Sequence, residues 1–313
     1  PTRQLRAMWA MHVTGGAPSD TVHELFASPS EHVRSWAVRL LMDQGETIEA
    51  HWKRTLRTAA ASDPSPVVRV AICSALQKMP LDDRWEIVAE LAAHAEDAHD
   101  HNLPLMIWYA AEPLAEVDPA RALELGLAAG ETIPLLQRFM IERIARGSSA
   151  EGVEILVAKL AASESPEERL TIIRGLRRGL EGRRQVDAPA AWSQLYEELE
   201  QSERAEVRRQ AAALGVAFGD PAARKTLREI IRDSDVETSA RREALEILRR
   251  VKDPQLPDAL LPLLRDPAMC QASLAAMALY GDGRIPAEII TQYGSMSPAA
   301  KLTALATRRS RTS

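Results

Sequence analysis

Histidines and carboxylates gather in one short segment of the chain. The eight residues from 94 to 101 contain His94, Glu96, Asp97, His99, Asp100 and His101. Imidazole and carboxylate groups are ligands that suit zinc, iron or copper. The candidate metal ligands are therefore His94, Asp97, His99 and His101, although their spacing matches no established motif.

The alternative is that this segment is a polar loop between two helices. Asn102 then caps a helix that begins at Leu103-Pro104, and the apolar residues 105–111 bury that helix. A metal site needs at least three ligands that converge, with further groups that orient them. The two hypotheses differ in whether these side chains meet.

Arginines are concentrated just beyond the middle of the chain. The cluster consists of Arg174, Arg177, Arg178, Arg183 and Arg184. On a helix the first three project together, where they can meet a phosphate or an acidic partner. The alternative is a solvated face with salt bridges to Glu167, Glu168 and Glu181. Because no aromatic residues are interleaved, nucleic-acid binding is disfavoured.

A third group lies near the beginning of the sequence. Trp9 and His12 are three residues apart and share one face of a helix that ends at Gly15-Gly16. We expect His12, Arg34 and Trp36 to line one groove as binding residues. The alternative is that the tryptophans fill the core and that His12 forms a hydrogen bond with a loop carbonyl.

Composition restricts the elements that can position these groups. Of 313 residues 46% are hydrophobic and 27% charged, which is typical of a globular protein. Alanine, leucine, glutamate and arginine dominate, and these residues favour helices, whereas an all-β protein needs more β-branched residues and glycine. The longest uncharged stretch, 267–281, has 15 residues and is too short for a membrane span of about 20.

Charge and cysteine usage exclude further classes. The net charge is −5, with −6 in residues 1–150 (14 basic, 20 acidic) and +1 in residues 151–313 (25 basic, 24 acidic). Nucleic-acid binders usually have a basic total, so this balance argues against one. Cys73 and Cys270 stand in apolar helical patterns and are predicted to be buried free thiols.

A repeat organises the chain. Residues 30–37, 65–72, 205–211 and 238–244 resemble one another, and a weaker copy covers 266–279. The shared arginines are 35 apart (Arg34, Arg69) and 33 apart (Arg208, Arg241). A small or apolar residue follows three positions later, which lets neighbouring helices approach closely. This period predicts one helix pair per repeat.

Helix starts are marked by a capping residue before proline, where the proline occupies the first helical position. The predicted starts are Asp63-Pro64, Asp118-Pro119, Ser165-Pro166, Asp220-Pro221, Asp253-Pro254, Asp266-Pro267 and Ser297-Pro298. Ser165 and Glu168 are spaced as a capping box.

These features resemble HEAT repeats. About nine antiparallel helix pairs of 35 residues fill 313 residues, which predicts an all-α solenoid with a concave face of second helices. We predict a single array over 1–313, regular at 19–79 and 204–282 and irregular at 130–203. The chain is expected to be a fragment of a larger multidomain protein.

A narrower resemblance rests on longer strings. They are MWAMHVTGG at 8–16, HVRSWAVRLL at 32–41, PLDDRW at 80–85, and residues 94–113. Together they resemble the HEAT-repeat region of the planctomycete-type haem-binding proteins, also called membrane-bound dehydrogenase-domain c-type cytochrome proteins. This resemblance implies an exported, periplasmic protein in which the array separates a dehydrogenase-like propeller from a cytochrome c domain. Haem c would lie outside this chain, which carries no cofactor.

Three hypotheses for function follow. The first is a non-catalytic scaffold for protein interactions, with the flanking propeller and cytochrome domains of the parent chain, or another protein, as partners. The second is a metal-binding or catalytic array with its site at residues 94–101. The third is an adaptor that binds a peptide or nucleic acid on the concave face, and nucleic acid would show strong salt dependence. The sequence contains no signal peptide and no membrane span.

Overall fold

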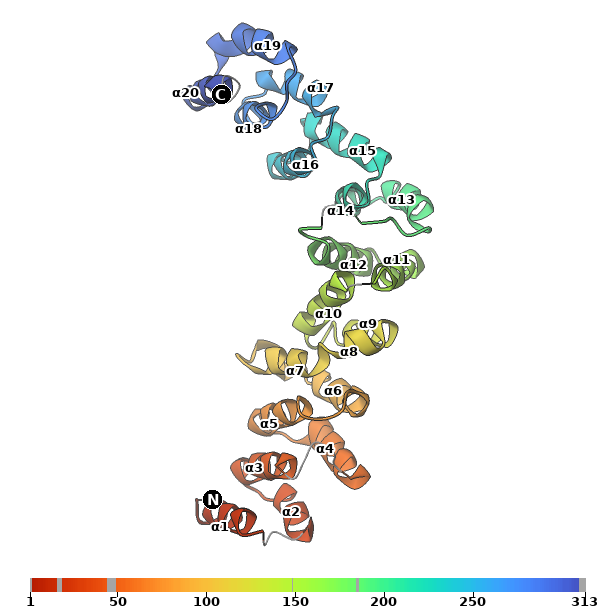
Figure 1. The fold of residues 1–313 in the computed structure, drawn as a ribbon, viewed down its shortest axis with the longest axis vertical. Helices are drawn as coiled ribbons and strands as arrows, with labels where there is room; N and C mark the ends of the chain where they lie inside the picture. Colours follow the sequence, from red (N-terminus) through yellow and green to blue (C-terminus); the bar gives the residue numbers. More distant parts are fainter. Residues whose placement is uncertain (1, 16–18, 44–48, 148, 184–185, 310–313) are drawn as a thin grey trace. The chain divides into compact units, whose positions relative to one another are not determined.

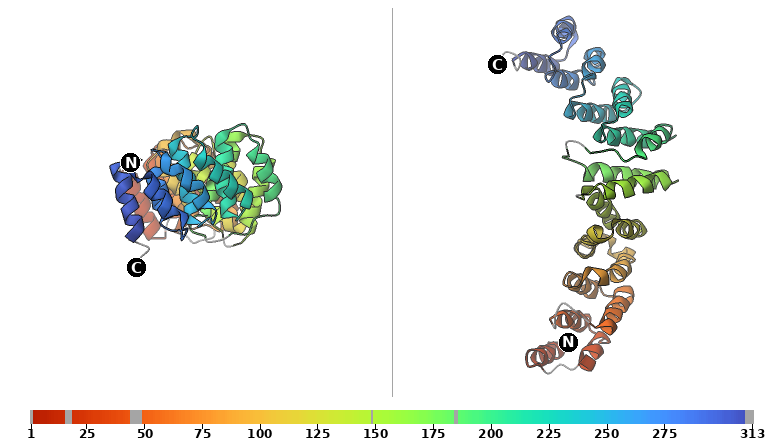
Figure 2. Two further views of the ribbon diagram at one scale, coloured as in Figure 1. Left: turned by 90° about the horizontal axis from the view of Figure 1, so that it is seen from above. Right: turned by 45° about the vertical axis from the view of Figure 1, so that its right-hand side comes forward.

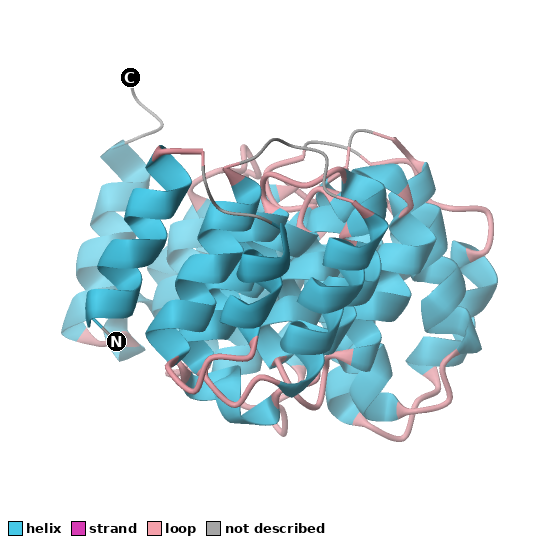
Figure 3. Ribbon diagram, turned by 90° about the horizontal axis from the view of Figure 1, so that it is seen from below, coloured by secondary structure: helices cyan, strands magenta, loops and turns pink. Residues whose placement is uncertain are grey.

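All regular structure in the computed structural model is helical (Figure 1 and Figure 3), within the residues it describes, 2–15, 19–43, 49–147, 149–183 and 186–309. This confirms the predicted all-α class. No described helix is both long and apolar enough to cross a bilayer. Gly16 and Arg184 lie outside the described residues.

The chain divides into two compact units, Pro1–Leu156 and Val157–Ser313, with the boundary inside α11 (Glu151–Ala162). This boundary falls in the stretch predicted to be irregular, and a single array over 1–313 stays a prediction. The helices of the first unit are α1 (Thr2–Val13), α2 (Ser19–Phe26), α3 (Glu31–Met42), α4 (Ala50–Ser62), α5 (Pro66–Leu76), η1 (Leu81–Asp83), α6 (Trp85–Ala92), η2 (Ala95–His99), α7 (Leu103–Ala111), α8 (Leu114–Val117), α9 (Pro119–Ala128) and α10 (Pro134–Arg146).

The second unit is also built of helices joined by short loops. Its helices are α12 (Pro166–Gly179), α13 (Trp192–Glu200), α14 (Ala205–Ala217), α15 (Pro221–Arg232), α16 (Thr238–Arg250), α17 (Leu256–Leu260), η3 (Leu261–Arg265), α18 (Cys270–Met277), α19 (Arg284–Gln292), η4 (Tyr293–Ser295) and α20 (Pro298–Arg309). After α1, the described helices form nine consecutive pairs, from α2/α3 to α19/α20, with the short α8 before α9. The predicted number of pairs is confirmed.

Each unit has two layers of helices, which can be followed in Figure 2. In the first unit the second helices α3, α5, α7 and α10 pack in succession, and α4 packs on α6 in the other layer. In the second unit α12, α14, α16, α18 and α20 form the corresponding layer, with α15 on α17 beside it. Each second helix therefore touches helices of its own repeat and of the adjacent repeats, as expected of a solenoid.

The apolar spacing read from the sequence produces the core. On α12 the side chains of Leu170, Ile173 and Leu176 are all buried, as is Leu180 beyond its end. The small or apolar residues that follow the repeated arginines are also buried, namely Ala37, Ile72, Ala211 and Ala244. Each fully buried leucine or isoleucine contributes about 1.5–3 kcal/mol relative to an exposed one.

Both cysteines are free and buried, as predicted. Burial raises the pKa of the Cys73 thiol to about 12 and also raises the pKa of Cys270. A thiol protonated at neutral pH is a poor nucleophile, so neither residue has the character of a reactive cysteine.

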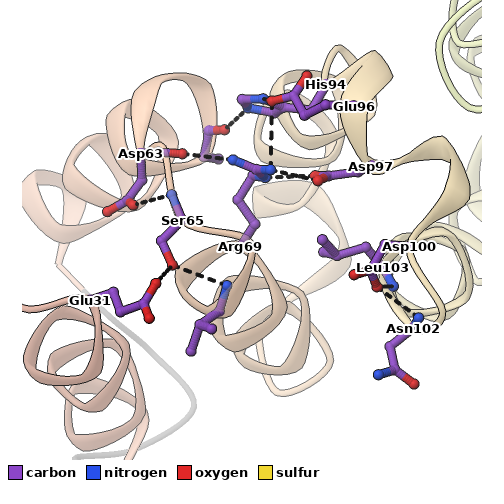
Figure 4. A network of polar contacts seen from close by, with 12 residues as sticks. Glu31, Asp63, Ser65, Arg69, His94, Glu96, Asp97, Asp100, Asn102 and Leu103 are labelled. Carbon is purple, nitrogen blue, oxygen red and sulfur yellow. Dashed lines mark hydrogen bonds and ion pairs between the residues drawn. The ribbon is translucent and has the colours of Figure 1, made fainter.

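The repeated arginines have one shared role, shown for Arg69 in Figure 4. Arg34 donates to the backbone carbonyl of Ser28 (2.9 Å) and Arg69 to that of Asp63 (2.8 Å), in both cases six residues earlier. Arg208 donates in the same way to Ser202, and Arg169 of α12, which was not part of the repeat seen in the sequence, donates to Ser163. Arg241 donates to the carbonyl of Ile231, ten residues earlier, at 2.9 Å. The arginine thus holds the turn between the two helices of its own repeat.

Most of these arginines also bind a carboxylate in the following loop. Arg34 donates two hydrogen bonds to Asp63 at 2.7 and 2.8 Å, and Arg69 donates two to Asp97 at 2.6 and 2.5 Å. Arg241 reaches Asp266 at 2.6 Å in the same way. Consecutive repeats are therefore joined by charge-assisted hydrogen bonds, which are stronger than neutral ones.

Three of the predicted helix starts are wrong. The helices begin later than Asp63-Pro64, Asp253-Pro254 and Asp266-Pro267 predict, at Pro66, Leu256 and Cys270. Asp63 and Asp266 each accept from the N–H group two residues later, so they order a turn before the helix, and Arg34 and Arg241 bind the same carboxylates. Asp253 is bound by Arg228 of α15. The other four starts, at Pro119, Pro166, Pro221 and Pro298, are confirmed.

Candidate functional site

An open hollow of about 410 Å³ lies in the second unit, on the layer of second helices. The second helices of three consecutive pairs, α12, α14 and α16, line it together with the turn that follows α12. Its charged lining side chains are Arg174, Arg177, Arg178, Arg183, Arg250, Glu181 and Glu243. The predicted binding residues Arg174, Arg177 and Arg178 are thus brought together in one site.

Helical periodicity explains this lining. Arg174, Arg177 and Arg178 have the i, i+3, i+4 spacing that aligns side chains on one face of α12. On α14 the lining residues Gln210, Ala213 and Ala217 follow the same rule, and on α16 they are Glu243, Ile247, Arg250 and Val251. Because the three helices pack in succession, their stripes form one surface.

Apolar side chains form part of the lining. They are Leu180, Ala213, Val216, Ile247 and Val251, and Val251 is 39% exposed. None of the described lining residues is aromatic. Five arginines and two glutamates give the lining a net charge of +3 (5 − 2). The hollow therefore combines positive charge with accessible apolar surface.

Two of the arginines are bound to groups on the next helices. Arg174 pairs with Glu206, and Arg177 donates to the Gln210 side-chain oxygen and to Glu243, the latter at 2.9 Å. The sequence predicted pairing with Glu167 and Glu168 on the same helix, but Glu167 pairs with Arg204 and Glu168 accepts from Ser163 Oγ. These arginines therefore connect consecutive repeats instead of neighbouring turns.

The candidate metal ligands are not assembled as a ligand set. Asp97 is buried and uses both carboxylate oxygens on Arg69, while His99 and His101 are exposed (Figure 4 shows the Arg69 network). His94 contacts the Ala60 carbonyl at 2.7 Å through Nε2 and Glu96 at 2.9 Å through Nδ1. Among the described residues no group of three or more histidines, cysteines and acids is placed to hold a metal ion.

The start of α7 corrects one detail of the loop hypothesis. Asn102 precedes the helix, but its side chain forms no capping hydrogen bond. Asp100 accepts instead from the backbone N–H groups of Asn102 and Leu103, both at 2.8 Å. These bonds, from Leu103 first and then Asn102, lower the pKa of Asp100. The loop is ordered by carboxylate interactions.

His12 and Trp36 line neither of the two described hollows that Arg34 borders, which have volumes of about 740 and 660 Å³. Arg34 itself is bound to Asp63. Trp36 packs edge-on against Trp9, with ring centroids 4.9 Å apart. His12 Nε2 lies 3.5 Å from an Asp43 carboxylate oxygen, so its partner is an acid and not the loop carbonyl that the alternative predicted.

Sequence reasoning missed three polar residues of the arginine-lined hollow, namely Gln210, Glu243 and Arg250. A signal for two of them was present, because Gln210 and Glu243 each follow a repeated arginine by two positions. Residues at equivalent positions of consecutive repeats lie beside one another in a solenoid. Aligning the repeats would have placed these side chains next to the arginines of α12.

Comparison with known proteins agrees with this architecture. Residues 192–279 match the family model of HEAT repeats. The match extends from α13 to α18, so it includes the α14 and α16 sides of the hollow and excludes α12. The predicted all-α class and its repeated helix pairs are confirmed, and the similarity to HEAT repeats covers residues 192–279.

Similar proteins add nothing about the role of this chain. No curated protein matches its sequence. The crystal structure of the Escherichia coli protein YibA is 13% identical over 91% of this chain and 95% of its own, with a TM-score of 0.40. An engineered protein is 18% identical over 98% of this chain and 91% of its own, also at 0.40. These TM-scores are too low to inform function.

Proposed function

We propose that this chain is a non-catalytic HEAT-repeat scaffold that binds a protein partner on its second helices. One observation carries the proposal: α12, α14 and α16 together expose an open hollow that is lined by both arginines and apolar side chains. Protein interfaces typically combine an apolar centre with a polar rim in which arginine is enriched. A HEAT-repeat surface of this composition is suited to holding another protein.

We further propose that the scaffold links a dehydrogenase-like propeller to a c-type cytochrome domain in an exported, periplasmic electron-transfer protein. The support is the resemblance of residues 8–16, 32–41, 80–85 and 94–113 to the corresponding HEAT region of that family. Haem c would be carried by the cytochrome domain and not by this chain. The parent protein would then be the oxidoreductase.

Binding to the two domains tests both proposals. The purified chain is mixed with a separately purified propeller and cytochrome domain from a protein of that family, and complexes are measured by sedimentation velocity. We expect each domain to sediment with the chain, and hydrogen exchange to slow on the second helices in the complex. An unrelated c-type cytochrome of similar charge is the matched control and is expected to sediment alone.

Two results would contradict the proposals. If neither domain binds, or both bind no better than the control cytochrome, the linking role is refuted. Sugar-dehydrogenase turnover by the chain alone, with an artificial electron acceptor, would refute the non-catalytic assignment.

A further inference from the structure

We propose that the hollow between α12, α14 and α16 is a docking site for an acidic, extended protein segment that carries apolar residues between its carboxylates. The inference rests on the proposed scaffold function and names the chemistry of its partner. The observations that carry it are the charge of the lining, its apolar side chains and the carboxylates already bound there.

Charge complementarity identifies the sign of the partner. Arginines border the hollow on two sides, with Arg174, Arg177 and Arg178 on α12 and Arg250 on α16. Neighbouring packed helices are about 8–10 Å apart, so α12 and α16 are separated by about 16–20 Å. An extended chain covers this distance with about five or six residues. A segment of that length with carboxylates toward both ends reaches both groups of arginines.

The internal contacts show that the site accepts carboxylates. Glu243 already binds Arg177 at 2.9 Å, and Glu206 binds Arg174. Glu243 is 49% exposed, so an incoming carboxylate can replace it on Arg177 without opening the core. Glu243 therefore acts as an internal competitor for the partner.

The same lining disfavours a nucleic acid. Glu181 and Glu243 would repel a phosphate backbone, and no described residue of the lining is aromatic and able to stack on a base. Residues 151–313 carry 25 basic and 24 acidic residues, so this half of the chain has almost no net positive charge to attract a nucleic acid. The apolar lining residues Ile247, Val251 and Val216 suit leucine or valine side chains of a peptide.

Fluorescence anisotropy with a labelled peptide tests the proposal on the full chain. The probe is a twelve-residue peptide of alternating glutamate pairs and leucines, and its matched control has glutamine in place of glutamate. We expect the acidic probe to bind at micromolar concentration, at least tenfold more tightly than the glutamine peptide at about 50 mM salt, and less so at about 300 mM.

Two charge-reversal variants separate the hollow from general electrostatics. The variant R177E/R178E is expected to weaken binding of the acidic probe at least tenfold. The control K225E/R232E makes the same change in net charge on α15, outside the hollow, and is expected to change binding less than twofold. Far-UV circular dichroism of both variants checks that the helices are retained.

A third variant distinguishes lost folding from lost binding. In E243Q the competing carboxylate is removed, so binding of the acidic probe is expected to become about threefold tighter, an increase that damage to the fold cannot produce. This size corresponds to an exposed charge pair of about 0.2–1 kcal/mol.

Three results would overturn the inference. They are equal binding of the acidic and glutamine peptides, unchanged binding in R177E/R178E, and tighter binding of a single-stranded twelve-nucleotide DNA than of the acidic probe. A failure here combined with binding of the propeller or cytochrome domain would leave the scaffold function intact and assign docking to another surface. Failure of both experiments would refute the scaffold function as well.

Discussion

The role of a charged side chain in this protein depends on the oppositely charged group that it contacts. Arg69 and Asp97 are only 2% and 3% exposed, and each satisfies the other through two hydrogen bonds (Figure 4). The hydrogen bonds to Asp97 raise the pKa of the Arg69 guanidinium above its ordinary value. Both oxygens of the Asp97 carboxylate accept from Arg69 and are not available to a metal ion. In the histidine-rich segment 94–101, Asp97 therefore stabilises the fold.

Replacing Arg69 by alanine is expected to destabilise the first unit strongly. Removing one partner of a buried ion pair leaves the other charge uncompensated, at a cost of about 3–5 kcal/mol. Urea unfolding followed by circular dichroism measures the shift in midpoint.

The matched control for this prediction is R57A. Arg57 pairs with Glu86 and Glu90, but it is about half exposed, and exposed pairs contribute little. Equal shifts for R69A and R57A would show that the Arg69–Asp97 pair has no special role in stability.

At the scale of helices, the boundaries depend on which acceptor satisfies the first N–H groups. Asp118, Ser165 and Asp220 accept from the backbone of the helix they precede, with proline in the first position. In the predicted capping box Ser165 accepts from Glu168 N, but the Glu168 side chain binds Ser163 instead of returning to Ser165. Of the two hydrogen bonds of a capping box, only the one from the Glu168 N–H to the Ser165 side chain is therefore formed.

The start of α7 is expected to lose stability in acid. Because hydrogen bonds lower the folded-state pKa of Asp100 below its unfolded value of about 3.9, its contribution is complete above about pH 4. It is lost as the pH falls through the folded-state pKa. Urea midpoints measured from about pH 6 to about pH 2 should show a smaller acid decrease in D100N than in the unmodified protein.

D100A provides the comparison for this prediction. Alanine removes the acceptor as well as the charge, and loss of such a cap costs about 1 kcal/mol at neutral pH. Asparagine keeps an oxygen acceptor and should cost less. Identical acid profiles for the unmodified protein and D100N would contradict a role for the Asp100 carboxylate.

At the scale of the whole molecule, the contacts are local along the chain. Second helices pack on the second helices of neighbouring repeats, α3 on α5 and α14 on α16 for example. The stability of repeat proteins is approximately a sum over repeats and their nearest interfaces. A local defect should therefore remain local.

Hydrogen exchange tests this expectation with R69A. The variant is expected to exchange faster in α5, η2 and α7, where the Arg69 network lies, and to leave α13–α16 of the second unit unchanged. Peptide-level mass spectrometry resolves these segments. A uniform increase along the whole chain would show that the molecule unfolds as one cooperative body.

Local features of the sequence determined the class of this fold. Helical residues, apolar positions three and four apart, the repeated arginines and proline at Pro119, Pro166, Pro221 and Pro298 act within one or two turns, so they can be read without partners. The joint projection of Arg174, Arg177 and Arg178 is of the same kind.

Tertiary structure alone decided which groups meet. Asp63 and Asp97 bind arginines 29 and 28 residues earlier, and Arg177 binds Glu243 across 66 residues. Such distances are set by how consecutive repeats stack, which local spacing does not contain. Local spacing therefore grouped His94, Asp97, His99 and His101 as candidate metal ligands, whereas in the structure the Asp97 carboxylate is bound by Arg69. For the same reason it did not place Arg250 in the hollow. The stacking of repeats decides which arginine each of these carboxylates binds, and therefore whether the carboxylate is available to a ligand.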